Sequence, residues 1–84
     1  MPTVHVRYFA SLREALGPQE TVQVPAGSTV AGLRAQLCAR GGRHAEALAA
    51  GRPVRAALAQ SVCTDDAVLS EGVEVAFFPP VTGG

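Results

Sequence analysis

The 84-residue chain contains no lysine and no tryptophan, and its aromatic residues are three phenylalanines and one tyrosine. Because lysine is missing, all seven basic residues are arginines, and they balance seven acidic residues to a formal net charge of zero. Nucleic acids and anionic membranes bind proteins through an electropositive surface, so we expect neither as a partner. The missing lysine also excludes chains of this protein in which copies are linked through lysine side chains.

Cysteine is scarce too. Cys38 and Cys63 stand 25 positions apart, with no Cys-x-x-Cys pair and no histidine at metal-ligand spacing. We therefore expect no metal site, and a reducing compartment rather than a disulfide framework. The sequence shows no signal-peptide pattern and no apolar run of ~18 residues that could cross a membrane. These observations predict a cytoplasmic protein without a membrane segment.

Length and composition favour one small folded domain. With 48% apolar and 17% charged residues the chain is not typical of a disordered protein, and its length leaves little room for an enclosed active site. Charge is uneven, because residues 1–43 carry five arginines and two acids, whereas residues 44–84 carry two arginines and five acids. We expect the acidic second half to surround the end of the chain and face a basic partner; the alternative is scattered, solvated charge.

Alternating residues predict two strands near the N-terminus. Residues 3–9 place apolar side chains on one face and a mixed set on the other, namely Val4, Val6 and Tyr8 against His5, Arg7 and Phe9. Residues 21–24 alternate again and should pair with the first strand. Between them, Ser11 and Glu14 have the spacing of a capping box, which predicts a short helix that ends near Gly17.

A longer helix should follow a turn at residues 25–27, with Ser28 or Thr29 as its cap. Apolar residues then recur at helical spacing, at Val30, Leu33 and Leu37. Arg40 would complement the dipole at the helix end, and Gly41-Gly42 would terminate the helix. Beyond it the pattern predicts a short helical turn at 43–50, extended segments at 54–59, 61–63 and 73–78, and a turn at 65–66.

This order of elements predicts an α+β fold. A mixed sheet packed on one main helix is typical of a β-grasp, ubiquitin-like domain, whereas a ferredoxin-like fold would need a second full helix. We expect the β-grasp domain to span residues 1–78 and residues 79–84 to form a protruding, flexible C-terminal tail.

The usual catalytic patterns are missing. His5 and His44 have no nucleophile or carboxylate at motif spacing, and we interpret them as ordinary surface histidines. Asp65 and Asp66 are typical of a turn and supply too few ligands for a metal. Cys38 lies beside the apolar stripe and is interpreted as a small hydrophobic residue.

The end of the chain is the remaining candidate, and it reads Pro79-Pro80-Val81-Thr82-Gly83-Gly84. Two prolines stiffen its exit from the last strand, and the small residues beyond them suit a narrow channel. The α-carboxylate of Gly84 is ionised at neutral pH and must be activated before it reacts, most simply as an acyl-adenylate made from ATP. Because the chain has no adenylating machinery, the pattern indicates a carrier or modifier served by a separate activating enzyme; the alternative is a frayed terminus.

Side-chain alternation also predicts a binding surface at the root of this tail. Phe9 shares a face with His5 and Arg7, and Phe78 shares a face with Glu74 and Ala76. The first and last strands of a β-grasp sheet are neighbours, so the two rings should form an apolar spot on the polar face. The alternative is that strand twist or a bulge buries one ring.

Two segments carry a resemblance to a known family: residues 75–84, Val-Ala-Phe-Phe-Pro-Pro-Val-Thr-Gly-Gly, and residues 6–14, Val-Arg-Tyr-Phe-Ala-Ser-Leu-Arg-Glu. They are similar to the C-terminal signature, and to the opening strand and short helix, of the small, sulfur-carrier subunits of molybdopterin synthase. Ala59 stands where that family often has Asn, and Val73 stands where an acidic residue often precedes the last strand.

The resemblance implies a sulfur carrier that binds no cofactor and is not catalytic alone. An E1-like adenylyltransferase would convert the Gly84 carboxylate to an acyl-adenylate with ATP, and a sulfurtransferase would convert this to a thiocarboxylate. The tail would enter the large catalytic subunit, where sulfur passes to cyclic pyranopterin monophosphate to form the molybdopterin dithiolene. The family's assembly is a heterotetramer, in which Phe9 and Phe78 match apolar positions at which the carrier docks.

Three alternatives stay open. The chain could be a related thiocarboxylate carrier for thiamine thiazole or tRNA thiolation. It could be a ubiquitin-like modifier joined singly to target lysines, or an interaction domain with an incidental tail.

Overall fold

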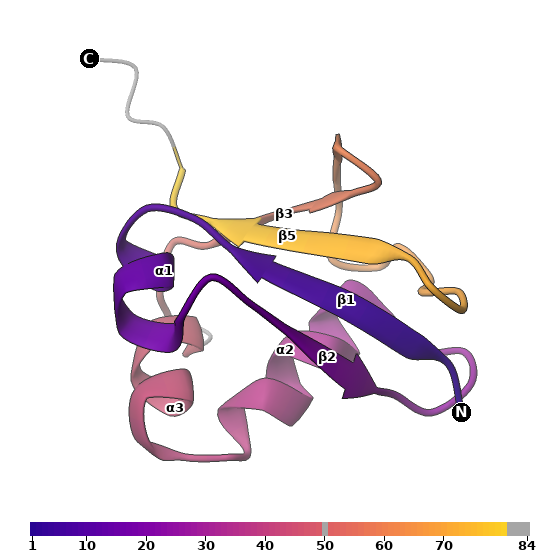
Figure 1. Ribbon diagram of the computed structural model, residues 1–84, viewed down its shortest axis with the longest axis horizontal. Coiled ribbons are helices and arrows are strands. Elements are labelled where there is room, and N and C mark those ends of the chain that lie inside the picture. The colour runs from indigo at the N-terminus through magenta and orange to yellow at the C-terminus, as the bar shows by residue number, and fades with distance from the viewer. Residues whose placement is uncertain (50, 81–84) are drawn as a thin grey trace.

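The computed structural model describes residues 1–49 and 51–80 of the chain. Five strands form one mixed sheet, and three helices pack against one of its faces (Figure 1). In the order β2-β1-β5-β3-β4, the strands are β2 (Gln19–Gln23), β1 (Thr3–Tyr8), β5 (Glu74–Phe78), β3 (Arg55–Leu58) and β4 (Ser61–Cys63). The helices are α1 (Ser11–Leu16), α2 (Val30–Cys38) and α3 (Gly42–Leu48).

Strand pairing confirms the predicted β-grasp fold. β1 is antiparallel to β2 and parallel to β5, while β3 is antiparallel to both β5 and β4. The five predicted extended segments are all strands, with ends that differ by at most two residues from the expected ones. Because β1 and β5 run in the same direction, both finish at the same end of the sheet, where the chain continues into Pro79 (Figure 1).

The core lies between the sheet and the helices. The apolar face of β1 is buried as alternation predicts, and the α2 stripe is fully buried against it at Val30, Leu33 and Leu37. Burying one such side chain contributes about 1.5–3 kcal/mol, so this packing holds the helices to one face of the sheet and leaves the other face open.

The start of α1 differs from the prediction. Ser11 is the first helical residue, and Ala10, whose φ is 54°, occupies the cap position. The capping-box interpretation of Ser11 is therefore wrong, because the residue at the cap has no side-chain oxygen to accept a backbone N–H. The helix does end at Gly17, whose φ of 93° suits a residue without a Cβ.

The start of α2 settles which residue caps it, since the Thr29 hydroxyl accepts the N–H of Gly32 at 3.2 Å. The end of α2 corrects two expectations. The helix stops at Cys38, and Arg40 beyond it pairs with Glu20 on β2 instead of lying in the last turn. Gly42 is also the first residue of α3, so the glycine pair joins two helices rather than only ending one.

A tight turn joins β3 to β4. Leu58 pairs with Ser61, which leaves Ala59 and Gln60 as the turn, with φ values of 48° and 73°. Positive φ at both residues identifies a type I′ hairpin turn, which favours Asn and Gly. Ala59 therefore keeps the conformation that Asn would adopt at lower cost. Val73 packs against the core and its carbonyl accepts the His5 N–H at 2.9 Å, so neither departure from the family pattern alters the strands.

Two features of residues 1–49 and 51–80 concern membranes and metal ions. No helix in this part of the chain is long and apolar enough to cross a membrane. The same residues contain no group of three or more His, Cys, Asp or Glu side chains placed to hold a metal ion.

Candidate functional site at the open face of the sheet

The face of the sheet that the helices leave uncovered carries the candidate site. Side chains alternate along a strand, so Tyr8 and Phe77 point into the core while the residues after them belong to the open face. Tyr8 and Phe77 are each 1% exposed, whereas Phe9 is 38% exposed and Phe78 is half-buried. Both predicted contact residues therefore reach the surface, at the end of the sheet where β1 and β5 finish.

Phe9 and Phe78 lie next to each other. Tyr8 pairs with Phe77 in the parallel register, and the Phe9 N–H donates to the Phe77 carbonyl at 3.1 Å. Phe9 follows Tyr8 and Phe78 follows Phe77, so the two phenylalanines are the next pair of neighbours between these segments. This geometry agrees with the alternation of the sequence, and the role of the two rings in partner binding stays a prediction.

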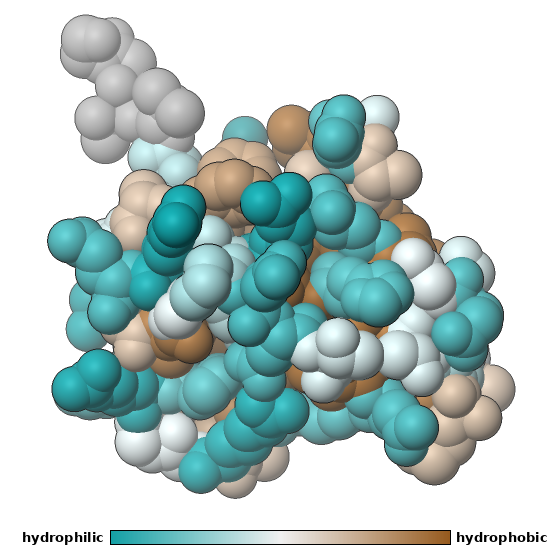
Figure 2. All heavy atoms as spheres, viewed as in Figure 1, coloured by the Kyte–Doolittle hydropathy of each residue, from teal (hydrophilic) through white to brown (hydrophobic). Residues whose placement is uncertain are grey.

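Three smaller apolar residues extend this surface across the sheet. The register aligns Ala76 of β5 with Ala57 of β3 and with Val62 of β4, and Val62 is 68% exposed. We call the five residues the open-face patch: Phe9, Ala57, Val62, Ala76 and Phe78. Apolar colours gather along the upper side of the molecule, beside the base of the tail (Figure 2). Phe9 and Val62 are the exposed members of the patch, Ala76 and Phe78 are half-buried, and Ala57 is 7% exposed between them. Apolar surface gathered in this way indicates a binding site.

Sequence reasoning missed Val62. The signal was present, because Val62 alternates with Ser61 and Cys63 in the segment predicted to be extended. Its face was undetermined until the β3–β4 register was known.

Two arginines border the open-face patch. Arg55 is exposed and is the β3 neighbour of Phe78. Arg7 is the β1 neighbour of Ala76, and its guanidinium carbon lies 5.5 Å from the centroid of the Phe9 ring. The Arg7 guanidinium also lies 3.8 Å from the Glu74 carboxylate.

The expected acidic surface around the tail is formed only in part. Glu46 of α3 lines the same groove as Pro79, but arginines line that groove too. Glu71 accepts the N–H of Thr3, the first residue of β1, and Glu74 is the first residue of β5. These two acids lie a strand's length from the end where the tail leaves, because β5 crosses the sheet between them and Pro79.

The described part of the tail consists of Pro79 and Pro80, which are both half-buried. Pro79 lines one end of an open groove of about 600 Å³ that α1, α3 and residues 52–54 also line. The other residues predicted to thread into a partner, Val81, Thr82 and Gly83, and the reactive Gly84, lie outside the described residues. The boundary between domain and tail at residue 78 therefore stays a prediction.

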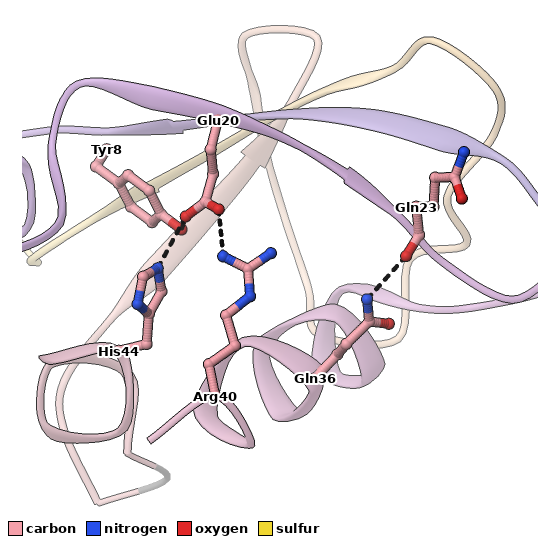
Figure 3. A network of polar contacts seen from close by, with 6 residues as sticks. All are labelled: Tyr8, Glu20, Gln23, Gln36, Arg40 and His44. Atoms are coloured by element: carbon pink, nitrogen blue, oxygen red, sulfur yellow. Dashed lines mark hydrogen bonds and ion pairs between the residues drawn. The ribbon is translucent and has the colours of Figure 1, made fainter. Parts of the chain in front are cut away.

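A polar cluster supports the patch from the core side (Figure 3). The Glu20 carboxylate of β2 accepts a hydrogen bond from the Tyr8 hydroxyl at 2.7 Å and contacts the His44 Nε2 of α3 at 2.8 Å. Arg40 forms an ion pair with its other oxygen. The Tyr8 ring stacks on Phe77 with centroids 6.4 Å apart and meets the His44 ring edge-on at 6.3 Å. The cluster thus ties α3 to the two strands that carry Phe9 and Phe78.

This cluster corrects the interpretation of His44. It is not an ordinary surface histidine, because it pairs with a carboxylate 24 residues earlier in the chain, a distance that no motif spacing reveals. His5 is exposed, as predicted.

The cluster also sets the ionisation of its members. Burial would raise the pKa of Glu20, but hydrogen bonds from His44, Tyr8 and Arg40 outweigh burial and lower that pKa to about 2. Burial and the hydrogen bond to Glu20 raise the pKa of Tyr8 above its usual range. At neutral pH the Glu20 carboxylate is therefore charged and the Tyr8 hydroxyl is neutral, which is the pairing that their hydrogen bond requires.

The cysteines do not join the site. The Cys38 thiol donates to the Leu48 carbonyl at 3.0 Å and packs beside the core, in agreement with the prediction. Cys63 also packs against the core, and burial raises the pKa of its thiol. A raised pKa disfavours the reactive thiolate.

Comparison with known proteins identifies the family. Residues 6–84 match the ThiS family. The chain belongs to the ThiS family. The molybdopterin synthase sulfur carrier subunit of Escherichia coli (strain K12) is 42% identical to this ThiS-family chain over 81 residues, which are 96% of this chain and 99% of that protein. The resemblance in the first and last strands is thereby confirmed along nearly the whole sequence.

Solved structures agree with this family. A putative molybdopterin converting factor, subunit 1, from Pyrococcus furiosus has a TM-score of 0.81 at 28% identity, covering 96% of this ThiS-family chain and 100% of that one. A chain in the complex of subunits 1 and 2 of molybdopterin-converting factor from Helicobacter pylori 26695 has a TM-score of 0.67 at 23% identity, covering 98% and 99%. The second likeness shows the fold alone.

Proposed function

We propose that this chain is the sulfur carrier of a molybdopterin synthase and acts in the cytoplasm. The observation that carries the proposal is the continuation of the central strand β5 into Pro-Pro-Val-Thr-Gly-Gly, in a ThiS-family chain 42% identical to a molybdopterin synthase sulfur carrier subunit. A strand at the centre of the sheet is a firm anchor for an extended end that must reach into another protein. The two cysteines are free, which suits a reducing compartment.

The reactive group in this proposal is the Gly84 carboxylate. An E1-like enzyme joins one carboxylate oxygen to the α-phosphate of ATP, and pyrophosphate leaves. The persulfide sulfur carried by a sulfurtransferase then attacks the acyl carbon and displaces AMP, which departs with that oxygen. A thiol reductant cleaves the resulting acyl disulfide and leaves a terminal thiocarboxylate. After the sulfur attacks cyclic pyranopterin monophosphate, water hydrolyses the bond between acyl carbon and sulfur and restores the carboxylate, so that two charged carriers supply one dithiolene.

The open-face patch would position the tail in this proposal. A large catalytic subunit that covers Phe9 and Phe78 would hold the root of the tail at a fixed place, because both rings lie at the end of the sheet from which Pro79 leaves. The 42% identical protein of Escherichia coli is by its name a subunit of molybdopterin synthase, which supports an assembly with a second subunit for this chain as well.

The test is a mass measurement on the intact protein. After incubation with ATP, an E1-like adenylyltransferase and a sulfurtransferase, we expect the mass to rise by one oxygen-to-sulfur exchange. A matched variant with one alanine appended after Gly84 should show no such rise, because its new terminus no longer fits the activating site.

Each outcome bears on the proposal. Sulfur transfer that survives the appended alanine would refute Gly84 as the reactive residue. Adducts of higher mass, in which Gly84 is joined to lysines of other proteins, would favour a modifier. A thiocarboxylated chain that yields no dithiolene with a large subunit and precursor would favour another thiocarboxylate carrier.

A further inference from the structure

The two arginines at the open-face patch are in different electrostatic situations. The Arg7 guanidinium has Glu74 at 3.8 Å and the Phe9 ring beneath it, so part of its charge is already balanced within the chain. Arg55 is exposed, and within residues 1–49 and 51–80 its side chain takes part in no ion pair. The patch therefore has one balanced and one unbalanced cation on its border.

Arg55 cannot stay outside an interface that covers Phe78. The two residues are register partners on adjacent antiparallel strands, and alternation places both side chains on the open face. Opposite residues on one face have Cβ atoms about 4.5–5.5 Å apart. A partner that buries the Phe78 ring thus also removes water from the Arg55 guanidinium.

An arginine that loses water without gaining a partner weakens binding, and a like charge facing it weakens binding further. The guanidinium offers a planar fork of N–H donors that a carboxylate accepts in two parallel bonds. An acidic side chain on the partner satisfies both requirements, whereas a basic partner surface satisfies neither.

We infer that the protein that receives the tail has an acidic docking surface, with an apolar centre that covers Phe9 and Phe78 and a carboxylate that pairs with Arg55. This inference rests on the proposed function, because it takes the large subunit of molybdopterin synthase as the partner. The contact is local, since the chain has no net charge to attract a partner from a distance.

The experiment measures binding of the large subunit from the same source organism to charge variants of the full chain. At low salt, we expect Arg55→Glu to raise Kd roughly tenfold or more, and Arg55→Gln to raise it by a smaller factor of about three. Ala35→Glu on α2, in the helical layer, makes the same one-unit change in net charge as Arg55→Gln and should leave Kd within about twofold. Thermal unfolding of each variant checks that the fold is intact.

Salt separates a charge effect from a change of shape. Charges on a surface are screened over about 10 Å at 0.1 M salt and about 3 Å at 1 M, so the gap between Arg55→Glu and the unchanged chain should narrow as salt rises. A pair that the interface shields from water is screened less, so the narrowing is small where Arg55 is fully covered. Equal losses of binding by Arg55→Glu and Arg55→Gln at low salt would show a change of shape and overturn the inference.

The remaining outcomes are also decisive. Equal binding by Arg55→Glu and the unchanged chain would overturn the acidic surface, and tighter binding by the variant would show a basic one. In both cases loss of binding by Phe78→Ala would leave the proposed function standing. Failure of the unchanged chain to bind the large subunit would overturn both proposals together.

Discussion

The two faces of the sheet use neighbouring aromatic residues for opposite purposes. Tyr8 and Phe77 stack on each other in the core, whereas Phe9 and Phe78, the next residue of each segment, lie on the open face. The helix-covered face satisfies its polar groups within the chain, with three side chains gathered on Glu20. The open face instead leaves apolar surface and Arg55, which forms no ion pair within residues 1–49 and 51–80, so we expect a partner to complete its interactions.

The largest expected effect separates the two phenylalanines of β5. Phe77→Ala should lower the free energy of unfolding by about 3–5 kcal/mol, because it opens a cavity in the core beside Tyr8. Phe78→Ala should lower it by about 1 kcal/mol or less, yet weaken binding of the large subunit by roughly tenfold or more. Urea titration and a binding isotherm give the two quantities.

Phe77→Leu tests the same position with a milder change, in case Phe77→Ala does not fold. It keeps most of the buried volume and should cost less than about 1.5 kcal/mol. The contrast between the faces would be refuted by equal losses of stability from Phe77→Ala and Phe78→Ala.

Alternation along the chain was sufficient to predict this contrast. The faces of β1 and β5 follow from a two-residue period, and the α2 stripe and a cap at Ser28 or Thr29 follow from local spacing. These are short-range patterns, in which each residue's environment depends on neighbours within one or two turns.

The parts that sequence reasoning missed depend on contacts between distant segments. Glu20 meets Arg40 and His44 across 20 and 24 residues, and Val62 and Arg55 acquire their places only from the pairing of β3. The Ser11 capping box failed for a local reason, because the backbone enters α1 through Ala10 at positive φ. Half-chain charge sums misplaced Glu71 and Glu74, because β5 carries the chain from one end of the sheet to the other.

The second prediction concerns the helix-covered face of the sheet, where polar side chains are paired within the chain. Glu20→Gln should lower the free energy of unfolding at pH 7 by about 1.5–3 kcal/mol, because it weakens three hydrogen bonds to a charged acceptor. The pKa of Glu20 falls from 4.5 to about 2 on folding, so this stabilisation is present above pH about 4.5 and is lost as the pH falls towards 2. Urea titrations from about pH 2 to about pH 7, which include the interval over which this stabilisation is lost, measure both effects.

Glu46→Gln on α3 is the matched control for Glu20→Gln. Glu46 is exposed, and within the described part of the chain its carboxylate makes no ion pair. The control should keep the acid-dependent loss of stability, whereas Glu20→Gln should reduce it. An unchanged pH profile for Glu20→Gln would show that the cluster does not stabilise the fold.

The smallest expected effect comes from a position that serves neither face. Ala59→Asn should raise the free energy of unfolding by about 0.5–1 kcal/mol, because Asn tolerates the positive φ of this turn better than Ala. Ala59→Val should lower it, since a β-branched side chain fits that conformation worst. Binding of the large subunit should stay the same for both variants, because the turn lies beyond Val62 and outside the open-face patch. Opposite shifts in the urea midpoint of the two variants, with equal Kd values, would show that the turn affects the stability of the β3–β4 hairpin and not docking. A change in Kd would show that the docking surface includes this turn.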